Sequence, residues 1–400
     1  LMKYTDEQIE KLLLDRDYFK VVDALVDIVQ TDEATFHDHA AFIDAVSSAG
    51  YTDCYEIAFQ SFIKANTTKN ANPIVLKGLY LRIDPIIKAL GFRYFDAENS
   101  HNIPRDFYLR AKFMLYIAAS KYNDALVTIS MLIDEDERPT YYFQRSKLYS
   151  IQKKYQLALM DLDKAVEMAP TDATLYYHRA LLKQKLHDIQ GAFFDFESAI
   201  NFNSKNYIYY YSRGMLNESF EHYKNALDDF KKTIQLNPNY VQAFQEIAWC
   251  KYKLNYMKEA LSFINIAIQM DKNNAGSYYI RGCINNTLMK HQEAAQDEAF
   301  AIKLDNQSNK MWTSRLWHQK AWAEFRLGNY EQAEEDINQA IKLYNRNLAF
   351  LFLAMDIQIF GTKNFYNAMG ICKEILKLDP DNQRALMAKK EIEDGIRNNL

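Results

Sequence analysis

The chain has 400 residues, of which 48% are hydrophobic and 25% are charged, a composition too apolar for an intrinsically disordered protein. Its net charge of −4 and the absence of any lysine- and arginine-rich block argue against a nucleic-acid partner. Only 11 Gly and 7 Pro are present, which favours helices over sheets. No run of 18 apolar residues occurs, so no segment is predicted to span a membrane.

The first quarter of the chain is acidic, with 10 Lys/Arg against 16 Asp/Glu in residues 1–103. Its apolar residues have helical spacing, but the pattern is irregular. Within it, 74–95 is expected to form two short helices, because Asp84 and Pro85 are typical of an N-cap followed by a first-turn proline. We interpret 1–103 as divergent helical repeats; a small, separate helical N-terminal domain is the alternative.

From residue 104 onwards a regular repeat is evident. Alanines recur at intervals of 33 to 39 residues, at Ala125, Ala158, Ala192, Ala226, Ala260, Ala294, Ala333 and Ala368. Sixteen positions before each alanine lies a large apolar or aromatic residue, namely Leu109, Tyr142, Tyr176, Tyr210, Phe244, Tyr278, Trp317 and Phe352. Apolar positions three and four apart predict two helices in each interval, and the small alanine lets their backbones approach closely.

Two further columns of the repeat change together. In five intervals a basic residue is matched by an aspartate sixteen positions later, as Arg145/Asp161, Arg179/Asp195, Arg213/Asp229, Arg281/Asp297 and Lys320/Asp336. Where the first position is apolar, at Ile247 and Met355, the second is apolar too, and Lys112 with Thr128 is the exception. Because an unpaired buried charge is costly, we interpret these columns as ion pairs within each hairpin. A ladder of ligand-binding arginines is the alternative.

One interval is longer than the others by five residues, at 306–313. The extra residues are expected to lengthen a helix or to open the joint between two hairpins. The second outcome would place Trp312 beside Trp317 and Trp322 in a widened pocket. A tolerated loop insertion is the alternative.

The residues of this repeat carry a family resemblance. The segments Trp317–Trp322, Gly328–Ala333 and Ala340–Leu343 hold the aromatic, small, tyrosine and alanine positions of a tetratricopeptide repeat (TPR) in family order. The chain resembles that family in eight tandem repeats over about 106–381. The resemblance implies an all-α fold, a right-handed α-α superhelix (TPR solenoid) of stacked antiparallel helical hairpins.

The same resemblance sets the expected domain boundaries. Eight TPR-like repeats would occupy 104–381, and 382–400 would follow as a C-terminal capping helix that covers the last hairpin.

In TPR arrays the first helix of each hairpin lines the concave face. Transferred to this sequence, the inward positions predict an aromatic groove with scattered basic side chains, formed by Phe143, Lys147, Tyr177, Tyr211, Met215, Trp249, Tyr252, Tyr279, His318, Trp322 and Arg326. Tyrosine and tryptophan are common in binding hot spots. The alternative is that these rings merely pack against neighbouring helices.

The groove implies a non-catalytic scaffold or adaptor that binds a protein or peptide partner. A second hypothesis is a ligand-gated regulatory protein, in which a peptide or metabolite changes the shape of the superhelix. TPR arrays that clamp the C-terminal carboxylate of chaperones need asparagine and arginine at one first-helix position. Here that position holds Ala111, Gln144, His178, Ser212, Glu246, Ile280 and Gln319, so chaperone tails are not expected partners.

Signals for catalysis are missing from the sequence. It has no glycine-rich phosphate loop, no His-Glu-x-x-His and no nucleophile elbow, so we predict no catalytic residues, no cofactor and no enzyme activity. The cluster His37-Asp38-His39 would project to different faces of a helix, and no metal site is predicted. The four cysteines are expected to be buried apolar residues, at Cys54, Cys250, Cys283 and Cys372.

The location is expected to be cytoplasmic. A periplasmic or secreted protein is the alternative if a signal peptide has been removed before Leu1. No sequence feature specifies an oligomeric state.

Overall fold

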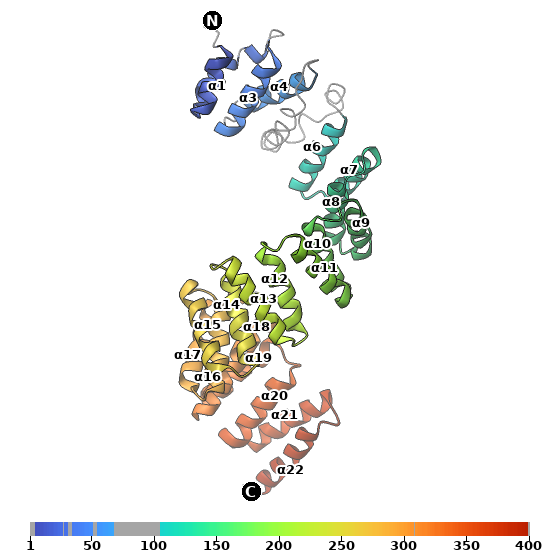
Figure 1. Ribbon diagram of the computed structural model, residues 1–400. Helices are drawn as coiled ribbons and strands as arrows, with labels where there is room; N and C mark the ends of the chain where they lie inside the picture. The colour runs from blue at the N-terminus through green and yellow to red at the C-terminus, as the bar shows by residue number, and fades with distance from the viewer. Residues whose placement is uncertain are drawn as a thin grey trace. The chain divides into compact units, whose positions relative to one another are not determined.

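A computed structural model describes residues 5–26, 28–30, 34–50, 54–67, 105–307 and 309–398 (Figure 1). Throughout these ranges the secondary structure is helical, with turns between helices and no strand. The all-α prediction is therefore confirmed. The two short helices expected over 74–95 lie outside the described residues.

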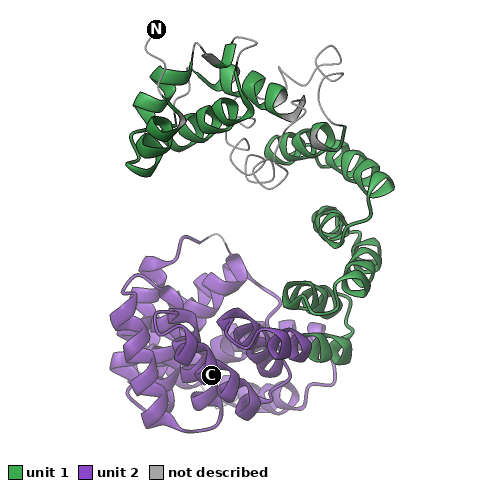
Figure 2. Cartoon of the chain, turned by 45° about the horizontal axis from the view of Figure 1, so that its top comes forward, with its two compact units in different colours: residues 1–195 green, residues 196–400 purple. Residues whose placement is uncertain are grey.

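The chain divides into two compact units, residues 1–195 (unit 1) and 196–400 (unit 2) (Figure 2). Unit 1 contains α1 (Asp6–Leu14), α2 (Tyr18–Leu25), the 3-10 helix η1 (Ile28–Gln30), α3 (Phe36–Ala49), α4 (Tyr55–Thr67), α6 (Arg105–Ala118), α7 (Tyr122–Glu135), α8 (Pro139–Ile151), α9 (Tyr155–Met168) and α10 (Ala173–Lys185). The division falls inside α11 (Ile189–Phe202).

Unit 2 continues the same alternation of helices. It contains α12 (Tyr207–Ser219), α13 (Tyr223–Leu236), α14 (Val241–Lys253), α15 (Met257–Met270), α16 (Ala275–Thr287), α17 (His291–Leu304), α18 (Lys310–Leu327), α19 (Tyr330–Leu343), α20 (Leu348–Asp356), the π-turn η5 (Ile357–Gly361), α21 (Phe365–Leu378) and α22 (Gln383–Asn398). Neighbouring helices pack against each other, for example α8 against α9 in unit 1 and α14 against α15 in unit 2.

The alanine register fixes where the second helix of each hairpin begins. From α7 to α21, every second helix is 14 residues long and starts three residues before its alanine. All eight alanines are fully buried, with 0% of their surface exposed. The prediction of a small residue at the helix crossing is thus confirmed. A large side chain at Ala226 would have no room there.

A left-handed residue ends the first helix of each of these hairpins, five positions before the alanine. Its φ is positive at Ser120, Lys153, His187, Glu221, Asn255, Met289, Gly328 and Lys363. The next residue returns a hydrogen bond to the last turn of the first helix. In hairpin α8–α9, for example, the Lys154 N–H donates to the Tyr149 carbonyl over 2.8 Å. This is the Schellman arrangement, which satisfies carbonyls that the helix end leaves without partners.

The five expected ion pairs are all formed. In hairpin α8–α9, for example, Arg145 Nε and Nη2 donate to the two Asp161 carboxylate oxygens over 2.8 and 2.7 Å. The aspartate side chains of the five pairs are between 0 and 8% exposed, which makes the pairing a requirement of the packed seam. The structural interpretation of these columns is confirmed.

Two of the three hairpins without this ion pair show what replaces it. Ile247 is fully buried, and Phe263 packs against the same cluster, so this hairpin replaces the ion pair with apolar contact. Lys112 has Thr128 where others have aspartate, and it donates instead to the Tyr108 hydroxyl over 3.4 Å.

The five extra residues lengthen a helix. α18 has 18 residues, whereas the other first helices from α8 to α16 have 13. Asn309 caps it by accepting hydrogen bonds from the Met311 and Trp312 N–H groups. Because five residues rotate a helix by about 140°, Trp312, Trp317 and Trp322 point in different directions along it. The expected tryptophan cluster is therefore not formed.

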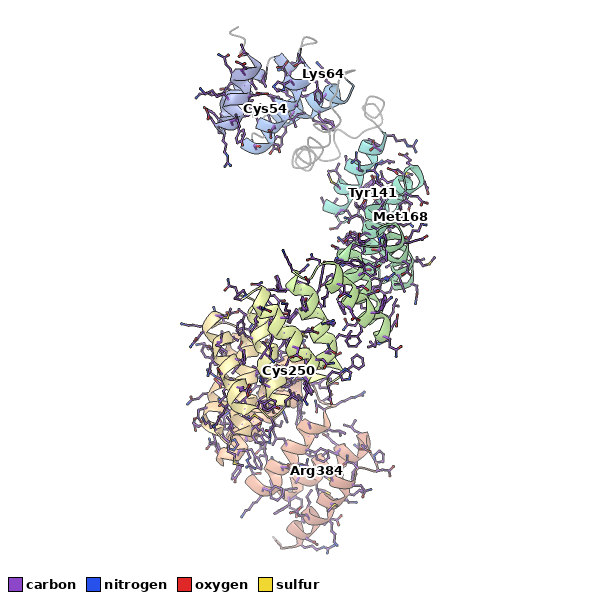
Figure 3. The ribbon with its side chains drawn as sticks, viewed as in Figure 1. Cys54, Lys64, Tyr141, Met168, Cys250 and Arg384 are labelled. Carbon is purple, nitrogen blue, oxygen red and sulfur yellow. The ribbon has the colours of Figure 1, made fainter. Side chains whose placement is uncertain are left out.

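The last two predictions concern the C-terminal capping helix and the cysteines. α22 occupies most of the predicted capping segment, while the domain boundaries themselves remain predictions. The cysteines are all free and buried, as expected, including Cys250 in unit 2 (Figure 3).

Candidate functional site

The predicted groove residues all project from first helices and keep part of their surface open. Nine of the eleven are half-buried, and Lys147 and Arg326 are exposed. Partial exposure of large aromatic rings is compatible with binding and also with packing between helices. Their neighbours in each unit distinguish these roles.

In unit 1, three predicted residues gather around His178. Lys147 Nζ lies 4.0 Å from the centre of the Phe143 ring, and that ring is 4.8 Å from the His178 ring. The Tyr177 ring lies 5.2 Å from the His178 ring. Burial lowers the pKa of His178 to about 4, helped by the charge of Lys147, so the ring is neutral at pH 7. Sequence reasoning left His178 out of the site.

Two adjoining cavities open along the first helices of unit 1. The larger, of about 670 Å³, lies between α6, α7 and α8 and is mostly apolar, with Tyr141 in its wall (Figure 3). The smaller, of about 340 Å³, lies between α8, α9 and α10. Lys147 and Ile151 line both cavities. We call this pair of cavities the unit 1 groove.

The unit 1 groove is basic as well as apolar. Its walls include Arg110, Lys147 and Lys185 and no acidic side chain. Burial lowers the pKa of Lys147, and no carboxylate pairs with its ammonium in the described part of the chain. A carboxylate brought by a ligand would relieve that cost.

In unit 2, several predicted residues serve mainly to pack the helices. The Tyr211 ring lies 5.7 Å from Phe230 and 5.0 Å from Tyr240, and Met215 joins the same apolar cluster. His318 lies 4.8 Å from the Phe350 ring.

Two residues near the end of α18 form a separate surface group. The Trp322 ring is 5.4 Å from His291, and the Arg326 guanidinium lies 5.5 Å from the Trp322 ring centre. This contact between a cation and an aromatic face keeps both side chains on the surface of unit 2.

Another part of unit 2 forms a small pocket of about 240 Å³, which we call the unit 2 pocket. Its lining consists of Glu218, Gln245, Glu246, Trp249, Asn274, Gly276, Tyr279, Ile280 and Trp312. Tyr279 and Trp312 meet edge to face at 5.0 Å. The predicted Tyr252 lies outside the lining, with its ring 5.3 Å from Trp249.

The electrostatics of the unit 2 pocket are dominated by two carboxyl groups. Burial raises the pKa of Glu246 to about 8, and the nearby Glu218 adds to the effect. Burial also raises the pKa of Glu218, against the hydrogen bond from Trp249 and the charge of Lys253. Sequence reasoning left Glu246 out of the site, whereas Glu218 stands at an inward position of the repeat and Trp312 was expected in a widened pocket with Trp317 and Trp322. Two carboxylates on neighbouring first helices, with an inserted tryptophan, were the available signal.

No group of three or more His, Cys, Asp or Glu side chains is placed to hold a metal ion among the described residues. Within those residues no helix combines the length and hydropathy of a bilayer-spanning segment.

Stacked helical hairpins with an alanine at each crossing define an α-helical repeat solenoid. Models of the tetratricopeptide repeat match residues 139–172, 207–240 and 314–347, which are the hairpins α8–α9, α12–α13 and α18–α19. The chain is a tandem tetratricopeptide repeat protein, as the resemblance implied.

Solved structures show the same fold. The crystal structure of the APC/C hetero-tetramer Cut9-Hcn1 matches with a TM-score of 0.53 at 12% identity, over 96% of this chain and 82% of that chain. A tetratricopeptide repeat protein from Parabacteroides merdae matches with a TM-score of 0.52 at 14% identity, over 64% and 98% respectively. At such identities the likeness is one of fold. A search of curated proteins by sequence found no match.

Proposed function

We propose that this protein is a non-catalytic scaffold or adaptor that binds an extended segment of a protein partner along its first helices. The observation that carries the proposal is the placing of the cavities. The unit 1 groove and the unit 2 pocket both open on first helices and are walled by partly exposed aromatic side chains. Aromatic side chains supply large contact area at low entropic cost, which suits them to peptide recognition.

The unit 1 groove favours a particular kind of segment. Its apolar walls suit hydrophobic side chains, and its three basic residues suit a segment that also carries carboxylates. Lys147 gains most from such a ligand, because its ammonium is partly desolvated and has no acidic partner among the described residues. We therefore propose an apolar segment with acidic residues as the occupant of unit 1.

The comparison with Cut9-Hcn1 is in line with this proposal. That structure is a hetero-tetramer, so a chain of the same fold assembles with a second protein there. Tetratricopeptide solenoids are typically interaction scaffolds, because stacked repeats present an extended surface instead of one enclosed pocket. We propose no catalytic residue.

The test is an affinity capture of partners from a lysate of the source organism. The wild-type chain is compared with a variant that carries Trp249→Ala and Trp322→Ala, and circular dichroism establishes that the variant remains folded. This unit 2 variant is expected to lose the partner. A variant with Phe143→Ala and Lys147→Glu tests unit 1 in the same way.

A matched control removes apolar surface from second helices. Val127, Met160 and Tyr366 are 58%, 66% and 68% exposed there, and their combined replacement by alanine should leave binding unchanged. If the groove variants keep the partner and the control loses it, the binding surface lies on the second helices and the proposal is wrong.

A further inference from the structure

The unit 2 pocket has three aromatic walls from three successive first helices. Trp249 comes from α14, Tyr279 from α16 and Trp312 from the extra turn of α18. Tyr279 and Trp312 meet at an interplanar angle of 68°, so they form a corner. At about 240 Å³ the pocket is smaller than most sites for drug-sized ligands. It has room for one side chain.

The lining holds two carboxyl groups and no basic side chain. Glu218 and Glu246 are its only ionisable carboxyl groups, and no lysine, arginine or histidine lies in its wall. Glu246 makes neither a hydrogen bond nor an ion pair in the part of the chain that the structure describes. The charge that most affects it is Glu218, another carboxylate. A cation is the ligand that this pair of groups lacks.

The polar amides of the pocket are already engaged. Gln245 Nε2 donates to Asn274 Oδ1 over 2.8 Å and to Ser277 Oγ over 2.7 Å. These bonds connect α14 to the start of α16 beside the pocket. Recognition is therefore left to the aromatic rings and the two carboxyl groups.

A lysine of the chain itself already contacts one of these rings. Lys253 Nζ lies 4.9 Å from the centre of the Trp249 ring, and its charge acts on Glu218. Lys253 is not part of the pocket lining, so it leaves the space between Trp249, Tyr279 and Trp312 open. Its contact shows that an ammonium can rest on Trp249.

We infer that the unit 2 pocket binds the cationic end of a lysine or arginine side chain from the bound segment. Its charge would rest against the faces of Trp249 and Trp312 and pair with Glu246, whose carboxyl group the bound cation would hold in its ionised form. This inference rests on the proposed function, in which a protein segment lies along the first helices. It adds that the segment carries a basic residue where it meets unit 2.

The test uses small probes and the indole resonances of the full-length chain. Tryptophan is labelled with ¹⁵N, and the four indoles are assigned with Trp→Phe variants. Nα-acetyl-lysine methylamide and Nα-acetyl-arginine methylamide are titrated in turn. We expect saturable shifts of the Trp249 and Trp312 resonances with at least one of them. Trp317 and Trp322 lie outside the lining and should not move.

Two comparisons separate charge from shape. Nα-acetyl-norleucine methylamide has a similar apolar stem and no charge, and it should give no saturable shift. Glu246→Gln should weaken the cationic probe roughly tenfold, because it removes a charge-assisted partner. Glu293→Gln removes an exposed carboxylate from α17 and should leave the affinity unchanged. Equal shifts with norleucine, or full affinity in Glu246→Gln, would overturn the inference.

The failure of this inference can be told apart from failure of the proposed function. A phage-displayed library of random dodecamers is selected on the wild-type chain and on Glu246→Gln. Peptides that need the first-helix aromatics yet show no basic residue support the scaffold and overturn the pocket. Binding of the free probes without any peptide that needs the first helices would support the pocket and contradict the scaffold.

Discussion

Arg281 and Asp297 join the two helices of hairpin α16–α17 by paired hydrogen bonds, from Arg281 Nε to Oδ2 over 3.0 Å and from Nη2 to Oδ1 over 2.6 Å. The guanidinium also lies 5.4 Å from the Tyr278 ring centre. The same relation recurs where Arg145 covers Tyr142 and Arg179 covers Tyr176. The aromatic residue of the repeat thus shields the ion pair from water, which strengthens the pairing.

Breaking one pair should destabilise the array, and replacing both partners should not. Arg213→Ala leaves Asp229, which is 4% exposed, with only the Asn217 amide at 3.2 Å. We expect a loss of about 3 kcal/mol in the free energy of unfolding. The double change Arg213→Ile with Asp229→Phe imitates Ile247 and Phe263, and should lie within about 1 kcal/mol of the wild type. Urea denaturation followed by circular dichroism measures both.

An exposed ion pair provides the control for that series. Lys231 and Asp228 lie 3.6 Å apart with side chains 53% and 81% exposed. Lys231→Ala should change the unfolding free energy by less than about 0.5 kcal/mol. A double variant as unstable as Arg213→Ala would contradict our account of the apolar hairpin.

Glu298 is expected to lower the stability of hairpin α16–α17. It is fully buried, both its carboxyl oxygens are without hydrogen-bond partners, and it packs where a Cβ on Gly282 would stand 2.4 Å from Oε1. The equivalent residues of the neighbouring hairpins are Ile264 and Ile337. Glu298→Met should therefore raise the unfolding free energy by about 1–3 kcal/mol. Thermal unfolding measures the gain, and a lower melting temperature would contradict it.

The gain at Glu298 should also depend on pH. Burial raises the pKa of its carboxyl well above the ordinary value of 4.5. The folded chain therefore holds this proton at pH values where the unfolded chain has released it, so its stability falls as the pH rises above about 4.5. The difference between Glu298→Met and wild type should be larger at pH 8 than at pH 5. With Glu298→Gln as reference, an unchanged difference would contradict the titration.

His318 should make unit 2 sensitive to acid. Burial against Phe350 lowers its pKa to about 4, whereas the unfolded chain binds the proton near pH 6.5. Stability is therefore lost as the pH falls from about 6.5 towards 4, by at most about 1.4 kcal/mol per pH unit. His318→Phe should remove this part of the pH dependence, and urea titrations at pH 7.5 and 5 measure it. The exposed His222, changed to Gln, should behave as the wild type does.

Two glycines should respond to the same substitution with opposite sign. Gly328 has a φ of +83° and an added Cβ would meet nothing within 4 Å, so Gly328→Ala is opposed only by backbone conformation, at about 1 kcal/mol. Gly370 lies within α21 with equal room and no positive φ, so Gly370→Ala should stabilise by about 1 kcal/mol. Melting temperatures that move in the same direction would contradict this explanation.

The fold was predictable because it depends on local and repeated signals. The alanine register predicted two helices per interval, and the paired columns predicted the ion pairs. Both follow from contacts between the two helices of one hairpin, sixteen residues apart, where the sequence spacing fixes the geometry.

The site was predictable only in part, because it depends on contacts between hairpins. The repeat pattern treats Tyr211 and Tyr279 as equivalent, yet Tyr211 packs against Tyr240, whereas Tyr279 lines a pocket with Trp312. That difference arises from the longer α18, which brings Trp312 back over α16. The spacing of the repeat does not predict this contact between Trp312 and Tyr279.

The left-handed turns have a consequence for how this array can be adjusted. Gly328 stands in one turn, whereas Lys153, Glu221, Met289 and their counterparts hold the same backbone conformation with a side chain present. Each such residue costs about 1 kcal/mol relative to a conformation it prefers. In a repeat protein, free energies add hairpin by hairpin and through nearest neighbours. Glycine at one turn would therefore make the local unfolding of one hairpin rarer while its first-helix surface remains chemically unchanged. The local stability of each repeat could thus change without any change in the residues with which that repeat binds.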